Sequence, residues 1–197
     1  VVPPWVDVKK IIPIERVNNP FAREIPEITD QIIVLYSGNM GASHDIDSML
    51  AAAKILQNDR KILFIFIGDG DKQSDVKSFI QENKLVNILL FPFQAESNIK
   101  NTLPVADISL VSLDEGMEDL MVPSKSFYYL AAGSALIAIA NQDSELSDLL
   151  SQHNCGLLVS PGKPLKLAEA IKRLASSPNE LDIMKKTARN LAETKYA

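Results

Sequence analysis

The stretch QIIVLYSGNMGASHDIDSMLAAAKILQ, residues 31–57, decides the fold because it holds a strand, a turn and a helix in that order. Residues 31–38 form an apolar run that ends in glycine, which is typical of a strand buried on both faces. Residues 45–57 place apolar side chains at helical spacing. A buried strand followed by an amphipathic helix is the repeating unit of a parallel α/β sheet.

The same unit recurs along the chain. Further strands are predicted within residues 61–70, 87–93, 106–113, 134–140 and 155–160, and further helices within 73–84, 96–104, 124–133, 143–152, 164–177 and 178–195. This alternation predicts a doubly wound α/β fold, with a six-stranded parallel Rossmann-like sheet and helices on both faces. The ligand of such a sheet binds at the carboxyl ends of the strands.

Residues 1–30 differ from the rest, because they hold five of the eleven prolines. We expect them to form an irregular lead-in or interdomain linker, followed by one Rossmann-like domain over residues 31–197. The composition is 46% hydrophobic, and the net charge of −5 includes no basic block, which argues against nucleic acid as a partner. The single Cys155 excludes an internal disulfide and suits a reducing, cytoplasmic compartment.

The turn after the first strand contains Gly38, Asn39, Met40 and Gly41. Glycines let the backbone turn tightly and approach a ligand, and the helix that follows favours an anion at its start. The spacing is not that of the dinucleotide fingerprint. Taken alone, the stretch is as consistent with a plain turn as with a phosphate site.

The turn after the second strand contains Gly68, Asp69 and Gly70. Asp69 and Asp71 are candidate metal ligands, but no other ligand shares the loop, so a turn with solvated acids is favoured. We expect no metal site. After the third strand, Phe93 and Gln94 are candidates for contact with an aromatic base; the alternative is a core phenylalanine and a solvated glutamine.

Residues 112–133 combine an acidic loop with the start of a helix. Pro123 sets the backbone before the helix, and Ser124 is predicted to be its N-cap. Lys125 then lies in the first turn, where the helix dipole disfavours a cation. It therefore either pairs with the acidic loop or meets an anionic ligand. No base accompanies Ser124 as a nucleophile, and the two tyrosines that follow suit core or rim positions, so no catalytic residue is identified.

The segments YSGNMG, FIFIGDG, MVPSKSFYYLAAG and NCGLLVSPGK, in this order, resemble the C-terminal, donor-binding domain of the retaining group-1 glycosyltransferases. These enzymes have two Rossmann-like domains in the GT-B arrangement, and the most similar subgroup builds bacterial capsule, O-antigen and exopolysaccharide chains. The resemblance covers nearly the whole chain. It implies that an N-terminal acceptor domain is absent from this sequence. It also implies a cytoplasmic enzyme, peripheral at the inner membrane face in its full-length form.

The resemblance further implies a nucleotide-sugar donor, with uridine the commonest base, a glycan or polyprenyl-linked acceptor, and no metal. The two glycine turns and Phe93 with Gln94 would border the donor. The diphosphate and ribose would lie along Met121, Val122, Pro123, Ser124 and Lys125. Backbone amides at the helix start would stabilise the departing nucleoside diphosphate.

Two features depart from the family pattern. Many members carry Arg and Lys after the first strand, and residues 38–48 contain neither. Many also carry a Glu-x7-Glu motif, whose second, ribose-binding Glu aligns with Lys125. We therefore hypothesise that Lys125 supplies the missing positive charge. An epimerase of sugar nucleotides with the same fold and a non-catalytic flavodoxin-like module remain alternatives.

Overall fold

A computed structural model describes residues 6–28, 30–112 and 122–197. Its strands are β1 (Ile32–Ser37), β2 (Ile62–Ile67), β3 (Ile88–Phe91), β4 (Ile108–Ser112), β5 (Ala135–Ile139) and β6 (Gly156–Val159). They pair in parallel, in the order β3-β2-β1-β4-β5-β6. The predicted six-stranded parallel sheet is confirmed, and its order reverses direction between β1 and β4, where such sheets bind ligands.

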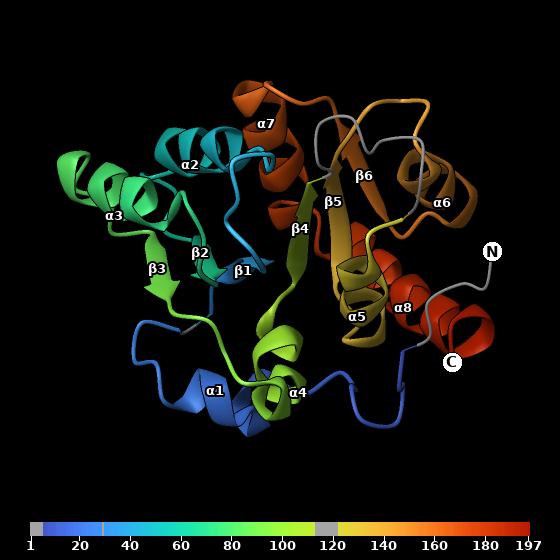
Figure 1. Ribbon diagram of the computed structural model, residues 1–197. Coiled ribbons are helices and arrows are strands. Elements are labelled where there is room, and N and C mark those ends of the chain that lie inside the picture. Colours follow the sequence, from blue (N-terminus) through green and yellow to red (C-terminus); the bar gives the residue numbers. More distant parts are fainter. Residues whose placement is uncertain (1–5, 29, 113–121) are drawn as a thin grey trace.

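Helices cover both faces of the sheet (Figure 1). Those of eight residues or more are α2 (Ile46–Ile55), α3 (Gln73–Glu82), α5 (Ser124–Ala131), α6 (Glu145–His153), α7 (Pro164–Ala175) and α8 (Pro178–Lys195). The short helices are α1 (Pro20–Arg23) and α4 (Ile99–Thr102), with single 3-10 turns at Arg16–Asn18, Glu96–Asn98 and Leu103–Val105. The helix predicted over residues 96–104 is therefore wrong as one element. Its regular hydrogen bonding cannot extend through Pro104, which lacks an amide hydrogen.

Two apolar clusters hold the layers together. One lies between the sheet and α2, α3 and α7, and includes the phenylalanines of β2. The other lies on the opposite face, with α5, α6 and the lead-in segment. The long helix α8 contributes side chains to both clusters. Leu181 and Met184 belong to the first cluster, and Ala188 and Leu191 belong to the second.

Pairing along the sheet is uneven at its centre. All six residues of β1 pair with β2. The register of β1 with β4, in contrast, consists of Val34 opposite Ile108 and Leu35 opposite Ser109. The register of β1 with β4 therefore ends at Leu35, two residues before the end of β1.

The lead-in has few regular elements, yet it packs onto the domain. The side chains of Val6, Ile11 and Phe21 are buried in the second cluster. Arg189 of α8 donates hydrogen bonds to the carbonyls of Val8 (2.9 Å) and Ile11 (2.8 Å). The structure therefore makes residues 6–28 a part of the packed domain as well as its entry.

Candidate functional site

The glycine turns after β1 and β2 lie against each other at the carboxyl edge of the sheet. A Cβ atom added to Gly68 would stand 1.9 Å from the carbonyl oxygen of Gly38, and the φ of Gly68 is +148°. The amide of Met40 donates to the carbonyl of Asp69 (2.7 Å), and the amide of Lys72 donates to that of Met40 (2.9 Å). The second turn thus supports the first, and only glycine fits at position 68.

The tip of the first turn is fixed by side chains as well. The hydroxyl of Tyr36 donates to the carbonyl of Asn39 (2.6 Å). A Cβ atom at Gly70 would lie 2.6 Å from Oδ1 of Asn39, so the amide side chain of Asn39 lies over the second turn. Met40 is fully buried, backbone included, and its amide and carbonyl bond to the second turn and to the segment directly after it. Its prediction as a donor contact stays a prediction.

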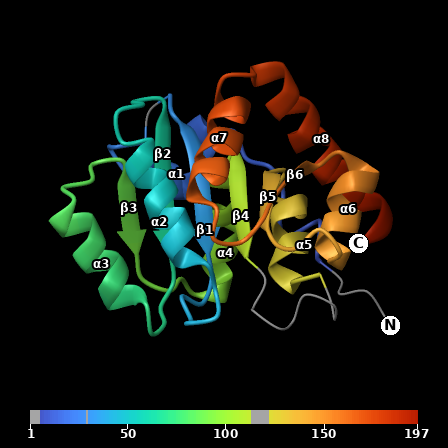
Figure 2. The same ribbon diagram turned by 90° about the horizontal axis from the view of Figure 1, so that it is seen from above.

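The start of α5 approaches the same turn through the side chain of Lys125. Nζ of Lys125 lies 3.0 Å from where a Cβ atom of Gly38 would be, and 5.1 Å from the ring centroid of Tyr36. Figure 2 shows the loop after β1 and the start of α5 along one edge of the sheet. The structure therefore brings Lys125 onto the Gly38 turn, with a cation–π contact to Tyr36.

The prediction that Ser124 caps α5 is wrong. Pro123 is the N-cap, with extended φ and ψ of −55° and 132°, and Ser124 is the first helical residue, with an exposed side chain. The helix therefore starts one residue earlier than a serine cap would place it, directly after a proline whose ring fixes φ. Val122 is partly buried against the core, and Met121 and the acidic loop before it lie outside the described residues.

Tyr129, one turn after Lys125, reaches the last residue of β1. Its hydroxyl accepts a hydrogen bond from the amide of Ser37 (3.0 Å) and donates one to the carbonyl of Ser37 (2.8 Å). The ring is buried, and burial raises the pKa of this phenol above its ordinary value. The prediction of a core position is confirmed, but the sequence did not indicate this contact, which joins residues 92 positions apart.

Phe93 and Gln94 follow β3, two strands away from β1. The alternative of a core phenylalanine is wrong, because the side chain of Phe93 is 68% exposed. The amide of Gln94 donates to the carbonyl of Pro92 (3.0 Å), and its Oε1 accepts from Asn98 (2.9 Å). Phe93 is thus available for stacking, while Gln94 is held within its own loop.

A cavity of about 380 Å³ opens next to the first turn, on the α2 side. Asp45 builds one wall: its carboxylate caps α2 through the amide of Ser48 (3.1 Å) and accepts from the amide of Gly162 (2.8 Å). Its amide donates to Oγ of Ser112 at the end of β4 (3.0 Å). Sequence reasoning missed this role, although an Asp three residues before Ser48 at a helix start is an N-cap signal.

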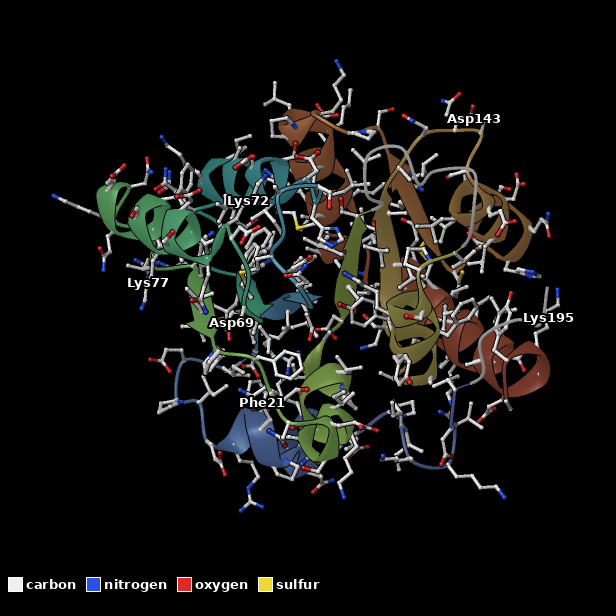
Figure 3. All side chains as sticks on the ribbon, in the orientation of Figure 1. Phe21, Asp69, Lys72, Lys77, Asp143 and Lys195 are labelled. Atoms are coloured by element: carbon white, nitrogen blue, oxygen red, sulfur yellow. The ribbon has the colours of Figure 1, made fainter. Side chains whose placement is uncertain are left out.

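Lys72, labelled in Figure 3, brings a second cation to the loop after β1, at His44. Its Nζ donates to the carbonyl of His44 (3.2 Å) and pairs with Asp47 (2.9 Å). The loop after β1 contains no basic residue, yet Lys72 and Lys125 approach it from two other elements. No sequence pattern indicated Lys72.

Two absences hold for residues 6–28, 30–112 and 122–197. Within these ranges, no three or more His, Cys, Asp or Glu side chains lie close enough together to hold a metal ion. No helix in these ranges combines the length and the hydrophobicity that a membrane span requires.

Comparison with curated proteins finds two informative relatives. The chain is 30% identical over 179 residues to "Probable glycosyltransferase WbjE" of Pseudomonas aeruginosa. The alignment covers 91% of this chain and 43% of the relative. It is 31% identical over 117 residues to "Putative colanic acid biosynthesis glycosyl transferase WcaI" of Escherichia coli strain K12. This alignment covers 59% of this chain and 28% of the relative. The chain therefore spans less than half the length of these relatives.

Solved structures share the fold. The structure of Anabaena Alr3699/HepE in complex with UDP and glucose superposes with a TM-score of 0.82 at 13% identity, over 98% of this chain and 51% of that one. The match confirms the fold of half of a GT-B glycosyltransferase. The model of the family described as "Glycosyl transferases group 1" matches residues 18–191. The chain belongs to this family.

Proposed function

We propose that this domain is the donor-binding half of a glycosyltransferase that uses a nucleotide-sugar, with UDP as the carrier. The longer protein would transfer a hexose or acetamido-hexose, with retention, to a growing glycan or lipid-linked acceptor in bacterial surface polysaccharide synthesis. The name of the relative from colanic acid biosynthesis supports a role in surface polysaccharide synthesis. The solved relative of the same fold that holds UDP and glucose supports the nucleotide. Family membership favours transfer over the epimerase alternative.

The observation that carries the proposal is the position of Lys125. Its ammonium group lies on the Gly38 turn, at the start of α5, beside the point where the strand order reverses between β1 and β4. The first amides of a helix have no intrahelical acceptor and can donate to an anion at such a position. A diphosphate placed there would meet a cation, helix amides and a glycine turn together.

This arrangement suits the departure of a nucleoside diphosphate. Negative charge develops on the bridging oxygen as the bond to the sugar breaks, and fixed donors at that position stabilise it without rearranging. Lys125 and the amides of α5 would supply this stabilisation, so the donor chemistry proposed here requires no resident metal. The exposed ring of Phe93 is our candidate for contact with the base.

Thermal denaturation with UDP, GDP and ADP tests the proposal. A ligand at about 100 times its Kd adds roughly 2.7 kcal/mol of stability. For a domain of this size the melting temperature should then rise by roughly 5–10 °C with UDP, and less with the other two nucleotides. No shift with any nucleotide at millimolar concentration would contradict the proposal.

Lys125→Ala identifies the site. Loss of a charge-assisted contact of about 1.5–3 kcal/mol predicts roughly 10- to 100-fold weaker UDP binding in a calorimetric titration. The matched control is Lys166→Ala, because Lys166 is exposed on α7 and pairs only on the surface, with Glu169 (2.9 Å). Equal Kd values for the two variants would remove Lys125 from the phosphate site.

A further inference from the structure

The polar backbone groups of Ser37 lie on the side of β1 that faces β4. Successive residues of a strand direct their amide groups to opposite neighbours. The carbonyl of Ile33 accepts from the amide of Asp107, just before β4, whereas the amide of Gly38 donates to Ile67 of β2. Ser37 is therefore turned toward β4, at a point beyond the last pair of the β1–β4 register, Leu35 opposite Ser109.

The hydroxyl of Tyr129 occupies the place that β4 would otherwise take. It accepts from the amide of Ser37 at 3.0 Å and donates to the carbonyl of the same residue at 2.8 Å. The ring is 1% exposed, so water has little access to replace it. One phenol thus satisfies both polar groups of the strand end.

Tyr129 and Lys125 lie one turn apart on α5, and both reach the end of β1. Tyr129 holds Ser37, and Lys125 lies on Gly38, the next residue. The position of the Gly38 turn relative to the start of α5 is therefore set by two side chains of the same helix. If the phenol is removed, Ser37 must shift to find other partners for its backbone, and Gly38 must move with it.

We propose that Tyr129 is a positioning residue of the donor site, whose hydroxyl replaces strand pairing at the switch point and fixes the Gly38 turn relative to α5. The role rests on the proposed function, since the turn matters to a ligand only if the donor binds there. Tyr129 touches no donor atom itself. It sets the geometry that the Gly38 turn and the start of α5 present to a diphosphate.

The test compares Tyr129→Phe with Asp107→Ala. The second change is also destabilising, but it lies at the amino end of β4, at the other end of the strands from Ser37. UDP affinity is measured by calorimetry at a temperature where both variants remain folded. Tyr129→Phe should weaken UDP binding about tenfold, because a hydrogen bond in a buried site contributes roughly this factor, whereas Asp107→Ala should stay within about twofold of the parent. Equal losses of affinity would mean that Tyr129 acts only through stability and would overturn the proposal.

Hydrogen exchange separates this proposal from the proposed function, because it needs no ligand. The amides of residues 36–41 should exchange faster in Tyr129→Phe than in Asp107→Ala, even if no nucleotide binds to the parent protein. Unchanged exchange in that segment would overturn the positioning role. If the phenylalanine variant does not fold, the parent protein still gives a result: the amide of Ser37 should be as protected as that of Leu35, and rapid exchange there would refute the proposal.

Discussion

Replacement of Asp107 by alanine should destabilise the domain at the amino end of β4, opposite the candidate site at the carboxyl ends of the strands. Asp107 immediately precedes β4, and its side chain is 14% exposed. Its Oδ2 accepts from Arg16 (2.6 Å) and from the amide of Ile33 (2.9 Å), and its Oδ1 accepts from Lys185 (2.7 Å). One carboxylate thus joins the lead-in, β1 and α8.

The expected loss follows from these three contacts. Hydrogen bonds to a charged group contribute about 1.5–3 kcal/mol each. Arg16 and Lys185 are 28% and 33% exposed, so water partly compensates both cations after the change. The amide of Ile33 loses its acceptor without such compensation. We expect a loss of about 3–4 kcal/mol in the free energy of unfolding, or roughly 10 °C in melting temperature.

Urea denaturation followed by circular dichroism measures the loss, with an unchanged m value as the sign of two-state unfolding. Asp143→Ala is the control, because Asp143 is exposed, and it should change stability by less than about 0.5 kcal/mol. A double-mutant cycle with Arg16→Ala should give a coupling of about 0.5–3 kcal/mol. A loss below about 1 kcal/mol for Asp107→Ala would refute this account of the network.

Two further predictions concern the packed interior. Gly68→Ala should cost at least about 3 kcal/mol in urea denaturation, because its Cβ atom would stand 1.9 Å from the Gly38 carbonyl oxygen. Gly162→Ala, also at positive φ but with nothing within 4 Å, should cost about 1–2 kcal/mol, and equal losses would refute the clash. Burial raises the pKa of Cys155 from 9.0 to about 11, so the folded thiol keeps its proton where the unfolded thiol loses it. Stability should therefore fall between pH 9 and 11 by up to about 1.4 kcal/mol per pH unit, and Cys155→Ala should remove that part of the slope; identical slopes would contradict it.

The fold was readable from the sequence because its signals are local. Apolar runs such as residues 31–38 and glycines such as Gly68 mark each strand and the turn that follows it. The sequence predicted a parallel sheet but not which strands are neighbours. Pairing between β1 and β4 joins segments more than 70 residues apart, which a local pattern does not reveal. The 3-10 turns around α4 were missed because the apolar pattern there continues through Pro104, where regular helical hydrogen bonding does not.

The candidate site was readable only in part. Strand ends located Gly38, Gly68 and Lys125, because the topology of a parallel sheet gathers them at one edge. Lys72 and Tyr129 were not assigned to it, since each acts through a contact with a loop distant in sequence. Whether a lysine after β2 or a tyrosine in α5 reaches that turn depends on packing, which no spacing rule encodes.

The short pairing between β1 and β4 also has a mechanical consequence. The sheet consists of two well-bonded halves, β3-β2-β1 and β4-β5-β6, joined along a line where the register contains two residue pairs. Bending stiffness is lowest where the fewest ladder bonds cross, so the domain should flex about this line more readily than about any other line between neighbouring strands. The hydrogen bond of Tyr129 crosses this line, because it joins a helix packed on one half to a strand of the other. A diphosphate held between Gly38 and the start of α5 would cross the same line, so a bound donor would also stiffen the domain.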